Sequence, residues 1–249
     1  MPEGPSLVIL RELVEELKLE GKEILKVTGN TKIAKERMLY QKVVGFKTWG
    51  KHFLICFDGF ALRIHLMMFG SYRINDRKDV EPRIGFEFKN AELNFYTCSL
   101  EFIEGDLNKV YDWQVDIMSD DWDTKATIKK LKAEPESLVC DVLLNQQLFA
   151  GSGNIIKNEV LYRTELHPLN KISSLPAAKL KALVVNARAY AFDFLEWKRA
   201  YVLKKHWLIY GKKLCPKKHE VHKEELGKNK RITFFCPICQ KRYKVKTSV

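Results

Sequence analysis

The first residues of the chain, Met1-Pro2-Glu3-Gly4-Pro5, carry groups that can react with an electrophilic carbon. A small second residue such as proline usually permits removal of the initiator methionine, which would expose a secondary amine on Pro2. A free α-amino group titrates near ~7.7–8.0, so a useful fraction is unprotonated at neutral pH and can form a Schiff base. Glu3 lies beside it as a general acid or base. The alternative is a flexible terminus with two prolines by chance.

Four residues near the C-terminal end have the spacing of a metal site. Cys215 and His219 form one pair with three residues between them, and Cys236 and Cys239 form a second pair after sixteen intervening residues. Two short chelating pairs at this separation suit a tetrahedral Zn²⁺, which would be structural because protein fills all four positions. His222 is an alternative to His219, although the spacing favours His219. The whole element could also be a metal-stabilised scaffold without a ligand of its own.

A glycine turn, Gly151-Ser152-Gly153, separates two apolar-faced helical segments. Glycine permits a tight reversal of the chain. We expect Asn154 to cap the helix that follows, and the helix N-terminus to attract phosphate. A turn of this kind can also be an ordinary connection between helices.

The charge is distributed unevenly along the chain. Lys and Arg total 43 and Asp and Glu total 31, giving a net charge of +12. Residues 1–116 hold 17 basic and 18 acidic side chains, whereas residues 117–249 hold 26 and 13. The basic half predicts a polyanionic partner, with nucleic acid as the leading candidate; the alternative is a solvated basic tail. Three further cysteines, Cys56, Cys98 and Cys140, stand singly and are expected in the core of a protein from a reducing compartment.

The pattern of the remaining sequence predicts an α+β fold in which elements of several types position these groups. We expect an N-terminal helix over 6–19 capped by Ser6, then about six to eight short strands forming an antiparallel β-sandwich. The expected domains are a catalytic β-sandwich domain (1–116), a linker (117–124), a helical helix–two-turn–helix domain (125–209) and a β-hairpin zinc finger (210–249).

No apolar run reaches the ~18–20 residues that span a bilayer, and acidic residues stand where a signal peptide needs basic ones. We therefore expect a cytoplasmic, nucleoid or, in a eukaryote, nuclear location, without secretion and without a membrane partner.

Five segments together resemble the formamidopyrimidine-DNA glycosylase and endonuclease VIII family of base-excision repair enzymes. They are PEGP at 2–5, GKHF at 50–53, HLMMFGSYR at 65–73, GSGNIIKNEVLYR at 151–163 and RITFFCPICQKR at 231–242. They occur in the family's order and span essentially the whole chain, although residues 75–150 match weakly.

The resemblance implies a bifunctional DNA glycosylase and AP lyase. Pro2 would be the catalytic nucleophile that attacks C1′ of the damaged nucleoside, and Glu3 would protonate the deoxyribose ring oxygen. Base release and a covalent imino intermediate would precede strand cleavage by β- and δ-elimination. Lys51 matches the family lysine that contacts phosphate near the lesion; the alternative is an exposed hairpin residue.

The resemblance also implies how damaged DNA, duplex or single-stranded, is held by what we expect to be a monomer. Asn154 and Arg231 match residues that bind DNA phosphate, although Arg231 could be one more member of the basic field. The reaction extrudes a base from the duplex, and apolar wedges commonly fill such a vacancy. Met67, Met68 and Phe69 occupy the family's void-filling loop; the alternative places them in the sandwich core.

The branch of the family is indicated by three features. PEGP and the Met-Met-Phe-Gly loop resemble endonuclease VIII, the interval from Phe194 to Tyr210 lacks the long glycine-rich loop that caps oxidised purines, and His219 resembles an endonuclease VIII-like subgroup. This favours oxidised pyrimidines as substrates. Ser6 and the Met-Met-Phe wedge depart from the common endonuclease VIII pattern. The competing function is a non-catalytic zinc-containing DNA- or RNA-binding protein on the same scaffold.

Overall fold

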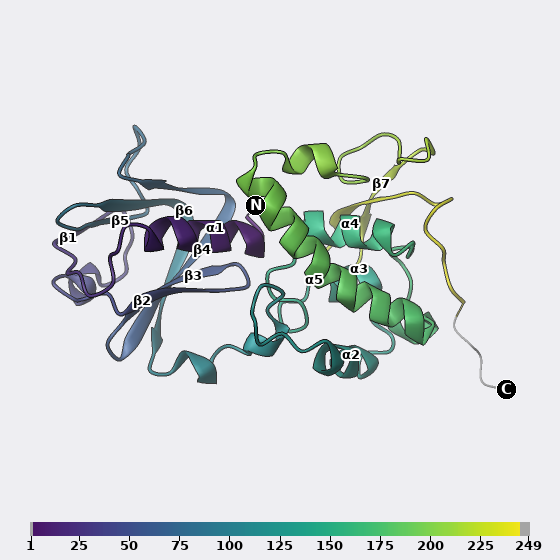
Figure 1. Ribbon diagram of the computed structural model, residues 1–249, viewed down its shortest axis with the longest axis horizontal. Coiled ribbons are helices and arrows are strands. Elements are labelled where there is room, and N and C mark those ends of the chain that lie inside the picture. Colours follow the sequence, from purple (N-terminus) through teal and green to yellow (C-terminus); the bar gives the residue numbers. More distant parts are fainter. Residues whose placement is uncertain (1, 245–249) are drawn as a thin grey trace. The chain divides into compact units, whose positions relative to one another are not determined.

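The computed structural model describes residues 2–244, and the chain divides into two compact units, Met1–Tyr111 and Asp112–Val249 (Figure 1). Met1, whose removal the sequence predicts, lies outside the described residues, as do the last five residues of the predicted zinc-finger domain.

The first unit begins with helix α1, Gly4–Glu15, which packs on the sheet through Leu7, Leu10 and Val14. The predicted N-cap at Ser6 is wrong, because the helix starts two residues earlier and Glu3 occupies the N-cap position in an extended conformation. Pro5 lies in the first turn, where a fixed φ and a missing N–H favour helix initiation. The helix therefore starts immediately after Pro2 and Glu3.

Six antiparallel strands form the rest of the first unit, in the order β1-β5-β6-β4-β3-β2 (Figure 1). Their bounds are β1 Lys26–Thr28, β2 Gly45–Trp49, β3 His52–Phe57, β4 Phe60–Ile74, β5 Ile84–Glu87 and β6 Glu92–Glu104. The predicted N-terminal helix and antiparallel strands are confirmed. The strands share one continuous hydrogen-bonded sheet, because β4 and β6 are much longer than the others.

The two long strands connect two halves of this sheet. The first half of β4 pairs with β3 and with the second half of β6, whereas the first half of β6 pairs with β5 and with the second half of β4. The register of the β4–β6 pair breaks between Leu66 and Ser71, at the junction of the halves. Strands commonly pass from one sheet to another at such bulges. Apolar side chains from both halves then share one core with α1.

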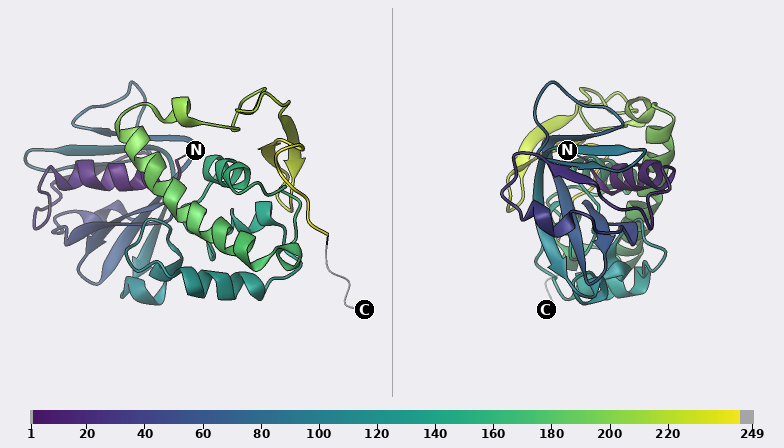
Figure 2. Two further views of the ribbon diagram at one scale, coloured as in Figure 1. Left: turned by 45° about the vertical axis from the view of Figure 1, so that its right-hand side comes forward. Right: turned by 90° about the vertical axis from the view of Figure 1, so that its left-hand side faces the viewer.

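The second unit is helical and ends in a β-hairpin (Figure 2). Its elements are α2 Thr124–Lys132, α3 Val139–Val142, α4 Asn154–Arg163, α5 Ala177–Arg199, β7 His222–Leu226 and β8 Arg231–Phe235. Short 3-10 helices lie at Lys35–Met38 and Leu107–Lys109 in the first unit, and at Trp113–Val115, Ile172–Ser174 and Leu203–His206 in the second. None of the helices within residues 2–244 is both long and apolar enough to cross a membrane.

The core of the second unit lies between α4 and α5. Tyr190 and Phe194 of α5 and Val160 of α4 are buried in it. Ile117 and Trp122, from the segment 117–124 that the sequence suggested as a linker, also pack there, with Ile117 fully buried.

Candidate functional site

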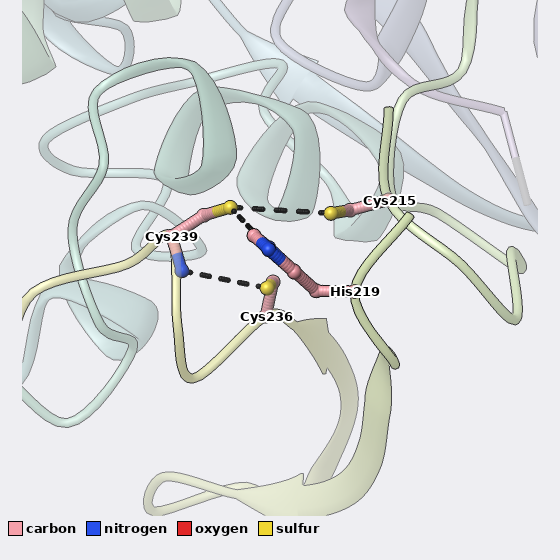
Figure 3. Close-up of side chains that lie close together, drawn as sticks. All are labelled: Cys215, His219, Cys236 and Cys239. Atoms are coloured by element: carbon pink, nitrogen blue, oxygen red, sulfur yellow. Dashed lines mark hydrogen bonds between the residues drawn. The ribbon is translucent and has the colours of Figure 1, made fainter. Parts of the chain in front are cut away.

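A cluster of four metal-ligating side chains lies at the β7–β8 hairpin (Figure 3). The ligand atoms of Cys215, His219, Cys236 and Cys239 all lie within 4.8 Å of one another. The Cys215 and Cys239 sulfur atoms are 3.9 Å apart. A tetrahedron with Zn–S bonds of about 2.3 Å places its sulfur atoms about 3.8 Å apart. The donor set and its spacing therefore fit one Zn²⁺ with four protein ligands.

The structure also decides between the two candidate histidines. His219 Nδ1 lies 3.2 Å from Cys239 Sγ, inside the cluster. His222 lies on β7 opposite Phe235, and its Nδ1 is 3.5 Å from a carboxylate oxygen of Glu224. The cluster therefore contains His219, the histidine that the spacing favoured, and His222 lies on the exposed face of the hairpin.

Helix α4 is joined to the hairpin by side chains of its first turns. Asn154 Nδ2 donates to the Ile232 carbonyl at 2.9 Å, and Asn158 Oδ1 accepts from the Phe234 N–H at 2.8 Å. The predicted role of Asn154 as N-cap is wrong: Gly153 holds that position, and Asn154 is the first helical residue. The asparagine amide is turned toward β8, so the glycine motif and the metal hairpin form one assembly.

Two fully buried ionisable side chains of α4 complete this assembly. Lys157 Nζ donates to Thr233 Oγ1 at 2.8 Å. The Glu159 carboxylate accepts the backbone N–H groups of Leu208, Ile209 and Tyr210 at 2.8–3.1 Å. A carboxylate that receives several N–H donors is compensated for its burial. Neither residue is marked by a motif of its own in the sequence, although both lie within the GSGNIIKNEVLYR segment.

The glycine turn ahead of α4 is held by Gln146. Its side-chain oxygen accepts the Gly151 N–H at 3.0 Å, and its amide donates to the Ser152 carbonyl at 3.1 Å. Gly151 has a φ of +93°, a conformation that L-residues rarely adopt. The turn is therefore fixed by a specific side chain in addition to its glycines.

Arg231 is the first residue of β8 and pairs with Leu226 across the hairpin. Its side chain is half-buried and forms no ion pair with any residue of 2–244. Its carbonyl accepts a hydrogen bond from the Thr233 hydroxyl at 2.9 Å. Because Thr233 also receives Lys157, the start of β8 is anchored while the Arg231 guanidinium remains available to an anion.

In the first unit, Pro2 and Glu3 precede α1 directly. Pro2 is half-buried, and Glu3 is only 3% exposed. The N-terminal end of a helix carries partial positive charge. The pair thus presents a nitrogen beside a sheltered carboxyl group at the positive end of α1.

Lys51 lies in the tight turn between β2 and β3, after Gly50 with its φ of +55°. The ring of His65 on β4 is hydrogen-bonded to the Lys51 carbonyl at 3.1 Å, and His52 Nδ1 lies 3.1 Å from the Tyr111 hydroxyl. Burial, with the nearby charge of Arg63, lowers the pKa of His52 to about 3. Neutral histidines therefore support the backbone that carries Lys51.

The segment Met67–Phe69 lies at the bulge in β4. Met67 is 46% exposed, Met68 is 59% exposed and Phe69 is 86% exposed. The alternative that placed them in the core is excluded, whereas Leu66 just before them is buried. Three large apolar side chains are thus held in solvent at one point of the first unit.

The three isolated cysteines behave as the sequence predicted. Cys56, Cys98 and Cys140 are buried free thiols. Burial raises the pKa of Cys98 and that of Cys140 to about 12. These thiols are therefore unreactive parts of the two cores.

Two domain families match the chain. Residues 1–102 match the formamidopyrimidine-DNA glycosylase N-terminal domain, and residues 114–192 match the formamidopyrimidine-DNA glycosylase H2TH domain. Solved structures share the fold over nearly the whole chain. A viral DNA glycosylase has a TM-score of 0.84 at 19% identity, covering 96% of this chain and 100% of that chain. A Lactococcus lactis formamidopyrimidine-DNA glycosylase, bound non-covalently to AP-site DNA, has a TM-score of 0.85 at 22% identity with the same coverage.

The chain thus combines the N-terminal domain and the H2TH domain of formamidopyrimidine-DNA glycosylases with a Cys₃His cluster. The chain belongs to the formamidopyrimidine-DNA glycosylase and endonuclease VIII family, which confirms the resemblance. It is 32% identical over 207 residues to endonuclease 8-like 3 of Mus musculus, covering 79% of this chain and 34% of that protein. It is 34% identical over 197 residues to endonuclease 8-like 2 of Bos taurus, covering 73% and 58%. The match spans about a third to three-fifths of these relatives.

Proposed function

We propose that this chain is a bifunctional DNA glycosylase and AP lyase that removes oxidised bases, with pyrimidines favoured, from DNA. The observation that carries the proposal is the sheltered carboxyl group of Glu3 directly after Pro2, at the N-terminus of α1. The positive end of the helix disfavours a proton on the Pro2 nitrogen, which keeps that nitrogen nucleophilic. The proposal requires that Met1 be removed.

In the proposed reaction, the Pro2 nitrogen forms a bond to C1′ as the bond from C1′ to the base breaks, and the proton that the nitrogen loses neutralises the departing base. Glu3 donates its proton to the ring oxygen, which opens the sugar and leaves an iminium between Pro2 and C1′. Loss of a C2′ proton then breaks the bond from C3′ to its phosphate oxygen, and a second elimination breaks the bond from C5′ to its phosphate oxygen. Hydrolysis of the iminium frees the enzyme.

The remaining site residues would bind DNA. Arg231 offers a guanidinium that has no ion pair among residues 2–244, and Lys51 offers a cation on a fixed turn. The Asn154 amide carries two N–H donors, of which the Ile232 carbonyl takes one, so the second can reach a phosphate oxygen. Zn²⁺ held by Cys215, His219, Cys236 and Cys239 would supply folding energy to the hairpin. It takes no part in the chemistry.

The preference for pyrimidines is supported by the similarity to endonuclease 8-like proteins and by the short connection after α5. Between Arg199 and His222 the chain contains one 3-10 helix and irregular segments, and no long glycine-rich loop. The Lactococcus lactis relative was crystallised with DNA that contains an oxidised pyrimidine.

The test is borohydride trapping of the imino intermediate. The N-terminal residue of the purified protein is first established by mass spectrometry. Protein with a Pro2 terminus is then incubated with duplexes that contain dihydrouracil or an abasic site, and reduced. We expect a covalent adduct with each, and none with Pro2→Gly or with protein that retains Met1, while both variants still bind DNA.

The competing function makes the opposite prediction. A non-catalytic nucleic-acid-binding protein would bind these duplexes and yield no adduct from a confirmed Pro2 terminus. Full lyase activity in protein with a blocked terminus would show that another amine is the nucleophile. A panel of dihydrouracil, thymine glycol, hydantoins and 8-oxoguanine would then test the pyrimidine preference.

A further inference from the structure

The Met67–Phe69 loop is produced by an unusually large bulge. Leu66 pairs with Cys98 and Ser71 pairs with Tyr96, so four residues of β4 lie opposite the single residue Thr97. Phe69 and Thr97 both have positive φ values, +67° and +51°. Such backbone conformations persist only where the surroundings hold them. Neighbouring contacts must therefore fix this loop.

Gly70 closes the end of the loop. A Cβ at this position would lie 2.6 Å from the Thr97 carbonyl oxygen and 2.8 Å from the Met67 nitrogen. Only glycine allows the two ends of the bulge to approach so closely. Gly70 therefore closes the loop.

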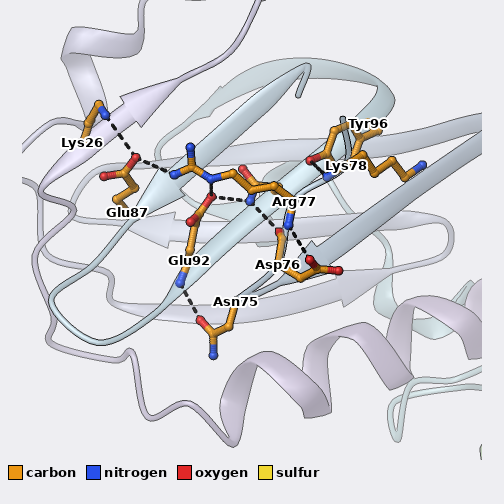
Figure 4. A network of polar contacts seen from close by, with 9 residues as sticks. Lys26, Asn75, Asp76, Arg77, Lys78, Glu87, Glu92 and Tyr96 are labelled. Atoms are coloured by element: carbon orange, nitrogen blue, oxygen red, sulfur yellow. Dashed lines mark hydrogen bonds and ion pairs between the residues drawn. The ribbon is translucent and has the colours of Figure 1, made fainter. Parts of the chain in front are cut away.

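Ser71 is the first paired residue after the bulge, and Lys78 contacts it. Lys78 Nζ donates to Ser71 Oγ at 2.6 Å and lies 4.8 Å from the centroid of the Tyr96 ring. The backbone N–H of Lys78 donates to the Tyr96 hydroxyl at 3.0 Å (Figure 4). Tyr96 is only 4% exposed and pairs with Ser71 across the sheet. One lysine thus joins both strands at the base of the loop.

The segment that carries Lys78 is itself anchored to the sheet (Figure 4). Arg77 forms ion pairs with Glu87 and Glu92, and Glu87 also forms an ion pair with Lys26. Asn75 and Glu92 exchange two hydrogen bonds, from the Asn75 N–H to the Glu92 carbonyl and from the Glu92 N–H to Asn75 Oδ1. Lys78 is therefore presented by a fixed turn.

We propose that Lys78 is a positioning residue that braces the base of the Met67–Phe69 loop, so that these side chains enter a duplex already oriented. The inference rests on the proposed function, because it concerns the base-extrusion step of that reaction. A wedge that is ordered before it binds loses less conformational entropy on insertion. Lys78 itself acts through Ser71 and Tyr96 and touches no reacting atom.

The proposal predicts that loss of Lys78 slows the reaction on duplex DNA and leaves the reaction on single-stranded DNA unchanged. Duplex DNA requires that the loop fill the vacated stack, whereas a single-stranded abasic oligonucleotide has no stack to fill. Lys78→Met keeps the length of the side chain and removes its charge and its donor. Lys78→Arg keeps both. Lys89→Met is the matched control, because Lys89 is an exposed lysine of the same unit without an ion pair in the described chain.

For Lys78→Met we expect the single-turnover excision of dihydrouracil from duplex DNA to fall about tenfold, the size of one lost charge-assisted hydrogen bond. Cleavage of the single-stranded abasic oligonucleotide should be unchanged. The fluorescence of 2-aminopurine beside the lesion, which reports unstacking, should rise more slowly. Lys78→Arg should restore the duplex rate, and Lys89→Met should match the unaltered protein on both substrates.

Equal losses of rate on both substrates would overturn the proposal, because a general structural role predicts them. No loss of rate on either substrate would also overturn it. If Lys78→Met does not fold, Ser71→Ala removes the acceptor at the loop base and should show the same selective loss on duplex DNA. Failure of the proposed function is distinct: the unaltered protein would then process neither substrate.

Discussion

The β7–β8 hairpin with its Cys₃His cluster and the N-terminal sheet both hold charged side chains in place, but by different physical means. In the second unit, ligands from a short stretch of chain converge on one point, and the buried polar side chains of α4 tie that point to the helices. In the first unit, an apolar core carries the structure, and the chemical groups lie at turns and at a bulge. The comparison indicates that a cluster of metal-ligating side chains and buried hydrogen bonds organise this part of the second unit, whereas packing organises the first.

Removal of the metal should have the largest effect, and it should affect the second unit alone. We expect Cys236→Ser, or chelation, to unfold the hairpin and lower DNA affinity by about 100-fold or more, because the metal supplies the folding energy of such small elements. Hydrogen exchange measured unit by unit should show loss of protection in β7 and β8 and none in β3 to β6. Protection retained in the hairpin of metal-free protein would contradict the assignment.

The buried carboxylate of Glu159 should give the next largest effect. Glu159→Ala leaves the N–H groups of Leu208, Ile209 and Tyr210 without their acceptor, so we expect the free energy of unfolding of the second unit to fall by about 3 kcal/mol. Glu136→Ala is the matched control, because Glu136 is exposed and its ion pair with Lys171 should be worth less than ~1 kcal/mol. If chemical denaturation gave equal losses for the two variants, the buried Glu159 carboxylate would contribute no more to stability than the exposed Glu136 carboxylate.

The first unit should respond to pH through His52. Folded His52 has a pKa of about 3 because of burial, and an unfolded histidine titrates near 6.5, so between these values the unfolded state binds more protons. The free energy of unfolding of this unit should therefore fall as pH drops below 6.5, by on the order of 2 kcal/mol near pH 5. His52→Gln should flatten this dependence in denaturation series at several pH values, and an unchanged slope would argue against a buried neutral histidine.

Arg231 should give the smallest change, and one confined to binding. Arg231→Ala removes a cation without breaking an ion pair of the part of the chain that the structure describes, so the free energy of unfolding should remain within ~0.5 kcal/mol of the original. The plot of log affinity against log salt should lose about one unit of slope, as expected for one phosphate contact. An unchanged slope in fluorescence anisotropy titrations would remove Arg231 from the DNA-binding surface.

The sequence by itself determined the features whose partners are close along the chain. The four ligands follow from two short chelating pairs, because such spacing brings the donor atoms together in almost any compact hairpin. The helix after Pro2 and the alternating strands follow from local periodicity, although the cap positions at Ser6 and Asn154 did not. The residue that caps a helix depends on the path of the chain before the helix. The Asn154 side chain is hydrogen-bonded to Ile232 of β8 and does not cap α4.

The tertiary structure alone decided the features that depend on register and on packing between distant segments. Nothing local indicates that Lys157 and Glu159 are fully buried, because their acceptors and donors come from residues about 50 to 76 positions away. The exposure of Met67–Phe69 follows from a break in pairing between β4 and β6, and a change of one residue in that register would turn the side chains to another face. The brace by Lys78 likewise exists only because the turn after β4 folds back on Tyr96.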